Sequence, residues 1–223
     1  MAFDEIYLFD AYGTLLDVHS AAARLSGRIG PVADRLSEIW RAKQLEYTWV
    51  YAATGQRASF WTLSERSLDY AIAISGASID DEMRAQLLDA YRELSAYRDV
   101  APALKALKAR GARLAILSNG DPDLLERLVD CSGLDGLFDR LLSVADAGTF
   151  KPHAAVYRLA VEAFDAPPDA MVFCSSNRWD IAGASAFGFR SIWVNRLGRP
   201  DEYPEMRPEK VISTLEGLLS DGS

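Results

Sequence analysis

The chain has few of the side chains that build metal centres and disulfide scaffolds. It contains only two cysteines and two histidines, and Cys131 and Cys174 lie far apart in no metal-ligand spacing. This usage argues against a disulfide framework and an imidazole-rich zinc site, and it suits a reducing compartment. No apolar run reaches about eighteen residues and no basic segment opens the chain, so we expect a cytoplasmic protein without a signal or a membrane span.

Positive charge is also scarce. The 24 lysines and arginines stand against 32 aspartates and glutamates, which gives a net charge of −8. This balance disfavours binding to nucleic acid or to anionic membranes, so we expect neither as a partner. An anionic small molecule must therefore meet a local positive site.

The second half of the chain alternates short apolar runs with helical patterns. Strands are expected over residues 6–8, 114–117, 141–142, 171–173 and 191–194. Helices are expected over 102–110, 122–132 and 153–164, and again after Asp180. This alternation predicts an α/β fold with a doubly wound parallel sheet that is covered on both faces. The polar, proline-bearing stretch 199–209 is predicted to be a surface loop.

Residues from about 20 to 97 show helical patterns alone. An aromatic segment runs from Trp40 to Tyr51, and a second apolar segment runs from Tyr70 to Ile74. We therefore expect an all-helical domain over 19–97, inserted into a core domain made of 1–18 and 98–223.

Polar residues follow the predicted strands. They are Asp10 after the first, Ser118 and Asn119 after the second, Lys151 after the third, and Ser175, Asn177 and Asp180 after the fourth. Carboxyl ends of parallel strands share one edge, so we expect these side chains to converge. Each signal has a plain alternative: Asp10 could cap a turn, Ser118 and Asn119 could cap a helix, and Lys151 could be solvated. Their ordered recurrence favours a shared site.

These motifs resemble a known family. Asp10-Ala11-Tyr12-Gly13-Thr14, Ser118-Asn119-Gly120, Lys151-Pro152 and Ser175-Ser176-Asn177 with Asp180 are similar to motifs of the L-2-haloacid dehalogenases (type II) of the haloacid dehalogenase-like (HAD) superfamily. The segment Trp40–Trp49 resembles that family's cap helix. The resemblance covers nearly the whole chain and implies a Rossmann-like HAD core with an inserted helical cap. It also implies a homodimer and hydrolysis of (S)-2-haloalkanoic acids to (R)-2-hydroxy acids and halide, with inversion and without metal or cofactor.

The resemblance also implies a role for each site residue. Asp10 attacks Cα of the haloacid and becomes an ester, and Asp180 is the general base for the water that opens it. Lys151, Ser175 and Asn177 hold Asp180 and the attacked carboxyl group. Thr14 steadies Asp10 by hydrogen bonding.

The remaining roles concern substrate binding. Ser118 and the backbone N–H groups of the Asp10 turn, at Ala11 and Tyr12, receive the substrate carboxylate. Arg41, Asn119 and Trp179, beside Lys151, cradle the halide, and Leu45 and Phe60 complete an apolar wall. The alternatives are a solvated helix face for Arg41 and plain packing for Leu45, Phe60 and Trp179.

Two departures bear on function. Phosphatases of the superfamily carry acidic residues where Tyr12 and Ser176 stand, so a magnesium-dependent phosphatase or phosphotransferase is disfavoured. Ala42 stands where family members commonly carry glutamine, which predicts a gain for longer 2-haloacids if Ala42 faces the pocket. Another activated 2-substituted acid, such as azetidine-2-carboxylate, is an alternative substrate. A non-catalytic binding protein is a further alternative, and the intact Asp10, Lys151 and Asp180 speak against it.

Overall fold

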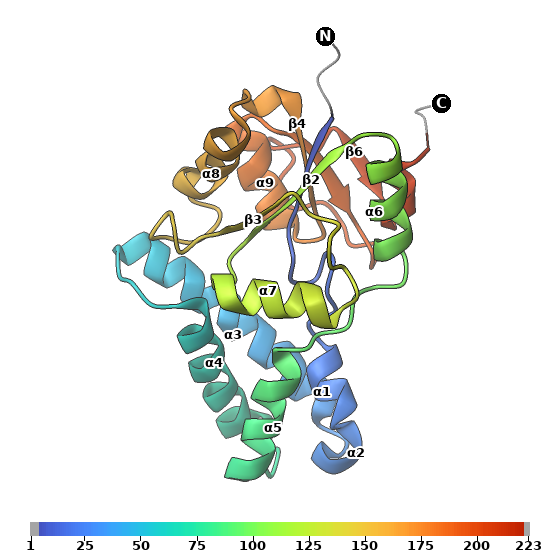
Figure 1. The fold of residues 1–223 in the computed structure, drawn as a ribbon. Coiled ribbons are helices and arrows are strands. Elements are labelled where there is room, and N and C mark those ends of the chain that lie inside the picture. Colours follow the sequence, from blue (N-terminus) through green and yellow to red (C-terminus); the bar gives the residue numbers. More distant parts are fainter. Residues whose placement is uncertain (1–4, 221–223) are drawn as a thin grey trace.

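The computed structural model describes residues 5–220, and its centre is a six-stranded parallel sheet (Figure 1). The strands are β1 (Ile6–Phe9), β2 (Arg113–Ser118), β3 (Arg140–Ser143), β4 (Met171–Ser175), β5 (Arg190–Val194) and β6 (Lys210–Ile212), in the order β3-β2-β1-β4-β5-β6. The strand order reverses between β1 and β4. Doubly wound sheets bind ligands outside the carboxyl ends of their strands at such a switch point.

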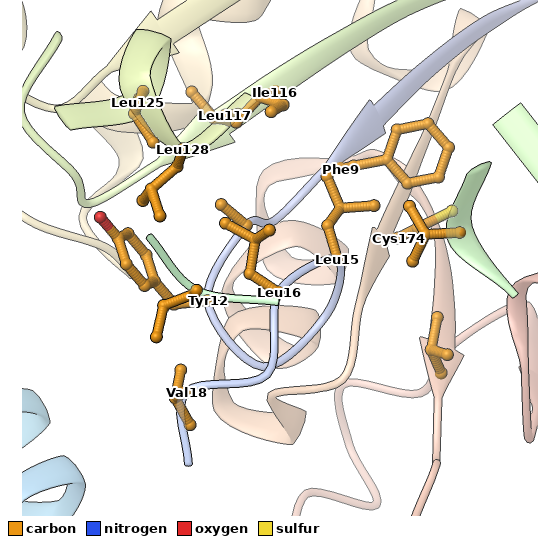
Figure 2. Close-up of a cluster of buried hydrophobic side chains, with 14 of the residues drawn as sticks. Phe9, Tyr12, Leu15, Leu16, Val18, Ile116, Leu117, Leu125, Leu128 and Cys174 are labelled. Carbon is orange, nitrogen blue, oxygen red and sulfur yellow. The ribbon is translucent and has the colours of Figure 1, made fainter. Parts of the chain in front are cut away.

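Helices cover both faces of the sheet, as the alternation predicts. They are α6 (Val100–Ala109), α7 (Pro122–Cys131), α8 (Ala154–Phe164) and α9 (Arg178–Phe187), with short 3-10 helices at Pro168–Ala170 and Leu215–Leu218. Figure 1 shows α8 and α9 together on one side of the sheet and α6 on the other. All four residues of β1 are buried, which suits a central strand with helices on both faces. Figure 2 shows the apolar cluster that Phe9, Leu15 and Leu16 form with Leu125 and Leu128 of α7.

The segment between β1 and β2 is helical, as predicted, and we call residues 20–91 the helical insertion. Its elements are α1 (Ser20–Arg24), α2 (Ser26–Ile29), α3 (Ala33–Thr54), α4 (Phe60–Ser75) and α5 (Asp81–Tyr91). Figure 1 places it beyond one end of the sheet, with α3 and α4 side by side. No strand lies within residues 20–91, and the two isolated bridges nearby, Tyr12 with Leu16 and Leu16 with Ala96, involve residues outside that range. The domain limits 1–18, 98–223 and 19–97 stay a prediction.

The structure differs from the sequence-based elements in two places. β6 was not expected, because Lys210–Ile212 is too short for a pattern and gains its strand only by pairing with β5. The helix expected after Asp180 begins at Arg178, since Asn177 takes the N-cap position and its carbonyl accepts the Asp180 N–H at 3.0 Å. Asp180 therefore lies in the first turn of α9. No helix within 5–220 is long and apolar enough to cross a membrane.

Candidate active site

The candidate site lies at the carboxyl edge of the sheet, where β1 and β4 meet. Phe9 pairs with Cys174, so Asp10 and Ser175 follow as neighbours, and the Asp10 N–H donates to the Cys174 carbonyl at 3.0 Å. Asp10 is only 5% exposed. The structure thus places Asp10 and Ser175, at the ends of β1 and β4, side by side.

The two oxygens of the Asp10 carboxylate have different surroundings. Oδ2 accepts hydrogen bonds from Asn177 Nδ2 at 2.8 Å, Thr14 Oγ1 at 2.9 Å and Ser175 Oγ at 3.3 Å. Among residues 5–220, Lys151 Nζ is the one hydrogen-bond donor to Oδ1, at 3.2 Å. Three donors therefore fix Oδ2, while Oδ1 keeps capacity for a further contact.

The loop after β1 holds its shape through its own backbone. Gly13 has a φ of 88°, in the left-handed region that favours glycine. The Ala11 carbonyl accepts the N–H groups of Thr14, Leu15 and Leu16. Thr14 Oγ1 also accepts the Ser176 N–H at 2.8 Å, so one hydroxyl joins the β1 loop to the β4 loop. No hydrogen bond from the N–H groups of Ala11 or Tyr12 is found within 5–220.

Lys151 is fully buried between two carboxylates. Its Nζ lies 3.2 Å from Asp10 Oδ1 and 2.8 Å from Asp180 Oδ2. Its backbone N–H donates to Asn119 Oδ1 at 3.0 Å, which ties the loop after β3 to the loop after β2. A buried ammonium is tolerated only with such partners, so the solvated-lysine alternative is wrong.

Asp180 is also fully buried, and its Oδ1 accepts the Tyr157 hydroxyl at 2.7 Å. Burial raises the pKa of Asp180 to about 6, and the negative charge of Asp10 also raises it, whereas Lys151 and Tyr157 lower it. A carboxylate with a pKa near neutral pH suits a general base. Of the three residues expected to hold the two carboxylates, Lys151 contacts both, whereas Ser175 and Asn177 contact Asp10.

Sequence analysis did not identify Tyr157. It occupies an apolar face of α8 and packs edge-on against Phe173, with ring centroids 5.8 Å apart, so its pattern is that of a core aromatic residue. Burial and the charge of Asp180 raise the pKa of Tyr157 well above its usual value, which keeps its hydroxyl a hydrogen-bond donor. A Cβ at position 183 would lie 2.5 Å from the Tyr157 hydroxyl, so Gly183 makes room for it.

Ser118 and Asn119 lie at the same edge, at the end of β2. Both are buried, and Ser118 Oγ accepts the Gly120 N–H at 3.1 Å. The helix-cap alternative for this pair is wrong, because the N-cap residue of α7 is Asp121. The Asp121 carboxylate instead accepts the N–H groups of Phe60 at 3.1 Å and Trp61 at 2.7 Å, in the helical insertion.

The insertion brings Arg41 onto the site loop. Arg41 is half-buried on α3, and its Nη2 donates to the Tyr12 carbonyl at 3.1 Å, so it is not a solvated surface residue. Its Nη1 donates to Gln44 Oε1 at 2.8 Å. Gln44 is fully buried and also accepts the Tyr91 hydroxyl at 3.0 Å. Sequence analysis missed Gln44, because a glutamine within a long helix normally faces water.

Aromatic rings form the boundary between insertion and core. The Tyr12 ring lies 5.0 Å from that of Phe60 and 5.8 Å from that of Tyr91, and Figure 2 shows its hydroxyl directed toward Leu125. Trp179 is half-buried and packs edge-on against Trp49 at 5.5 Å.

Two further positions on α3 differ in burial. Leu45 is half-buried, one turn after Arg41. Ala42 is exposed, so the condition for a gain with longer 2-haloacids, a side chain that faces the pocket, is not met: it points away from the face that carries Arg41 and Gln44.

The residues present do not fit the magnesium ion that many enzymes of this fold hold. Within 5–220 no group of three or more His, Cys, Asp or Glu side chains could bind a metal. Tyr12 and Ser176 supply no carboxylate, and the Asp10 oxygens accept from an ammonium, two hydroxyls and an amide. Mg²⁺ prefers anionic oxygens with water around it, which this set does not offer.

Comparison with known proteins places the chain in a class and then in a family. The family model of the haloacid dehalogenase-like hydrolases matches residues 5–188. (S)-2-haloacid dehalogenase 1 of Pseudomonas sp. (strain CBS-3) is 42% identical over 95% of both chains. A crystal structure of a dehalogenase covers 100% of both chains at 38% identity with a TM-score of 0.95.

A further solved relative is the L-2-haloacid dehalogenase from Xanthobacter autotrophicus with chloropropionic acid covalently bound. It is 33% identical, with 97% of both chains covered and a TM-score of 0.89. The fold is that of a haloacid dehalogenase-like hydrolase. Within that class, the chain belongs to the (S)-2-haloacid dehalogenases.

Proposed function

We propose that this protein hydrolyses (S)-2-haloalkanoic acids to (R)-2-hydroxy acids and halide, with Asp10 as nucleophile and without a metal. The observation that carries the proposal is the buried Lys151 ammonium between the carboxylates of Asp10 and Asp180. This arrangement supplies a nucleophile, a base and one cation that both carboxylates share. The covalently bound chloropropionic acid in the relative from Xanthobacter autotrophicus supports the substrate class.

In the first step, Asp10 Oδ1 attacks Cα of the substrate from the side opposite the halogen. The new bond is Oδ1–Cα, and halide leaves with the electron pair of the carbon–halogen bond. Oδ1 is the oxygen with fewer donors, so less hydrogen bonding is lost when it attacks. Attack from behind inverts the configuration at Cα.

In the second step, Asp180 takes a proton from the water that attacks the Asp10 carboxyl carbon. Negative charge then develops on Oδ2, where Asn177, Thr14 and Ser175 donate and form an oxyanion hole. The acyl C–O bond breaks, the hydroxy acid leaves with the original Oδ1, and Asp180 returns the proton to that oxygen. The new Asp10 carboxyl group releases the second proton of the water to solvent, which regenerates the carboxylate. Cα is untouched in this step, so the single inversion persists.

Substrate binding uses both parts of the molecule. The Ser118 hydroxyl and the backbone N–H groups of Ala11 and Tyr12 bind the substrate carboxylate. These groups donate hydrogen bonds to the anion, so no second cation is needed to bind it. Arg41, Asn119 and Trp179 surround the departing halide, and Leu45 and Phe60 form the apolar wall.

We also propose a cytoplasmic homodimer that forms through the insertion. Trp49, Val50, Tyr70 and Ile74 on α3 and α4 are large apolar side chains with 39%, 50%, 39% and 44% exposure. A second copy would cover them. Sedimentation of Val50→Glu with Ile74→Glu should give a monomer if these residues form the contact.

Halide release from the two enantiomers of 2-chloropropionate, with and without a chelator, tests the proposed reaction. We expect turnover of the (S) enantiomer alone, (R)-lactate as product and no effect of the chelator. A chelator-sensitive rate that magnesium restores would favour the phosphatase alternative. Equal consumption of both enantiomers would contradict a single Asp10 trajectory. Azetidine-2-carboxylate in the same assay tests the other substrate that the sequence leaves open.

A further inference from the structure

Asp121 links the two walls of the site. We propose that it is a positioning residue that sets the separation between the Ser118–Asn119 loop and the Phe60 wall, and through it the length of substrate accepted. The substrate part of this inference rests on the proposed function, whereas the link itself does not.

The carboxylate of Asp121 accepts hydrogen bonds from backbone N–H groups of the helical insertion. Oδ1 accepts the Phe60 N–H at 3.1 Å and Oδ2 accepts the Trp61 N–H at 2.7 Å, while no side-chain bond caps its own helix α7. These N–H groups open α4, and the next one, from Thr62, goes to Ser59 Oγ at 3.0 Å. A carboxylate is favourable at such a helix start, because the first N–H groups of a helix have no partner within it.

The core side of the link is held rigidly. The Gly120 carbonyl accepts the Ser143 hydroxyl at 2.7 Å, and Asn119 Oδ1 accepts the Lys151 N–H at 3.0 Å. A Cβ at Gly120 would lie 2.9 Å from Leu125 Cδ2 and from Tyr12 Oη, so the loop packs tightly at this point. Asp121 therefore extends from a loop that cannot shift freely.

The insertion side of the link begins at the apolar wall. Phe60 is the first residue of α4, and its ring lies 5.0 Å from the Tyr12 ring. The Phe60 N–H, which donates to Asp121, thus belongs to the residue that forms the apolar wall. Losing the carboxylate lets the start of α4 move away from the core, which leaves room for a longer substrate chain.

The test compares Asp121→Ala with Asp123→Ala, which removes the same charge from an exposed position in the first turn of α7. One readout is the ratio of kcat/KM for 2-chlorobutyrate to that for 2-chloropropionate. We expect Asp121→Ala to raise this ratio about fourfold, the scale of burying one methylene, and Asp123→Ala to leave it unchanged.

The second readout does not depend on activity. Amide hydrogen exchange at Phe60 and Trp61 should speed up about tenfold in Asp121→Ala, with the middle of α4 unaffected. Unchanged exchange at both amides would overturn the link itself. Faster exchange with an unchanged substrate ratio would overturn the positioning role while leaving the dehalogenase proposal intact.

Asp121→Asn keeps the test valid if Asp121→Ala does not fold. Its amide retains one acceptor oxygen at the same place, so it should protect one of the two N–H groups and give an intermediate substrate ratio. A ratio in Asp121→Asn equal to that of the unaltered protein, together with fast exchange at both amides, would also reject the inference.

Discussion

The carboxyl edge of the sheet and the helical insertion face the same site with different chemistry. The edge holds Asp10, Lys151 and Asp180 in a buried network of charged hydrogen bonds. The insertion presents mainly rings and one guanidinium, that of Arg41, supported by a buried amide. Groups proposed to make and break bonds therefore lie at the carboxyl edge of the sheet, and most groups proposed to select the substrate by size lie on helices of the insertion.

The largest expected effect comes from the edge. Asp10→Asn should lower turnover about 10⁴-fold or more, because a neutral amide is a poor nucleophile at saturated carbon. Halide release measures it, with the exposed Asp146→Asn as control. Single turnover of the unaltered enzyme in heavy-oxygen water should label Asp10 before the product. Label that enters the product directly would mean that water attacks the substrate.

Asp180→Asn should separate the two steps. The first needs no base, so a burst of halide persists, while ester hydrolysis slows about 10³-fold. Intact-mass measurement after mixing with 2-chloropropionate should show the acyl group on the protein. An unmodified mass together with a lost burst would remove Asp180 from the role of base.

Arg41→Lys tests the insertion's side of the comparison. The guanidinium contacts the Tyr12 carbonyl and Gln44 at once, and a compact ammonium cannot keep that planar arrangement. We expect the halide burst to slow about tenfold to a hundredfold while ester hydrolysis is spared. The exposed Arg35→Lys on the same helix is the matched control. An unchanged burst in Arg41→Lys would mean that Arg41 does not assist halide release and that the residues at the edge of the sheet carry out this step.

Tyr157→Phe should change how the rate depends on pH. Asp180 must be unprotonated to act as base, so ester hydrolysis falls as pH drops through the pKa of Asp180, about 6 in the free enzyme. The Tyr157 hydroxyl lowers this pKa, so its loss moves the acidic limb to higher pH and costs about tenfold in rate near pH 6. Stopped-flow rates from pH 5 to 8 measure this shift, with Tyr70→Phe as control. A limb that stays in place would mean that Tyr157 only packs.

Ala42→Gln should have the smallest effect. Ala42 is exposed on α3, so the added side chain should change kcat/KM for 2-chlorobutyrate and chloroacetate alike, within about twofold. A chain-length series measures the ratio. A loss of kcat/KM for 2-chlorobutyrate alone would mean that the side chain at position 42 faces the pocket.

Local sequence determined five of the six strands of the sheet and the placement of the polar residues that follow them. The apolar runs at 6–9 and 171–174 form buried parallel strands because both of their faces are covered, and Asp10 and Ser175 then stand at strand ends. The helices of the insertion follow from the 3.6-residue period in the same way. The sequence alone therefore predicts that polar residues recur after the strands.

Tertiary structure alone decided which partners these residues meet. Tyr157, Gln44 and Asp121 look in sequence like a core aromatic, a surface amide and a helix cap, yet each bonds a group far along the chain. Arg41 and Ala42 are adjacent in sequence, yet Arg41 is half-buried and Ala42 is exposed, because the helix turns them to different sides. Short-range pattern fixes periodicity and strand ends, whereas a buried hydrogen bond depends on which surfaces the fold packs together.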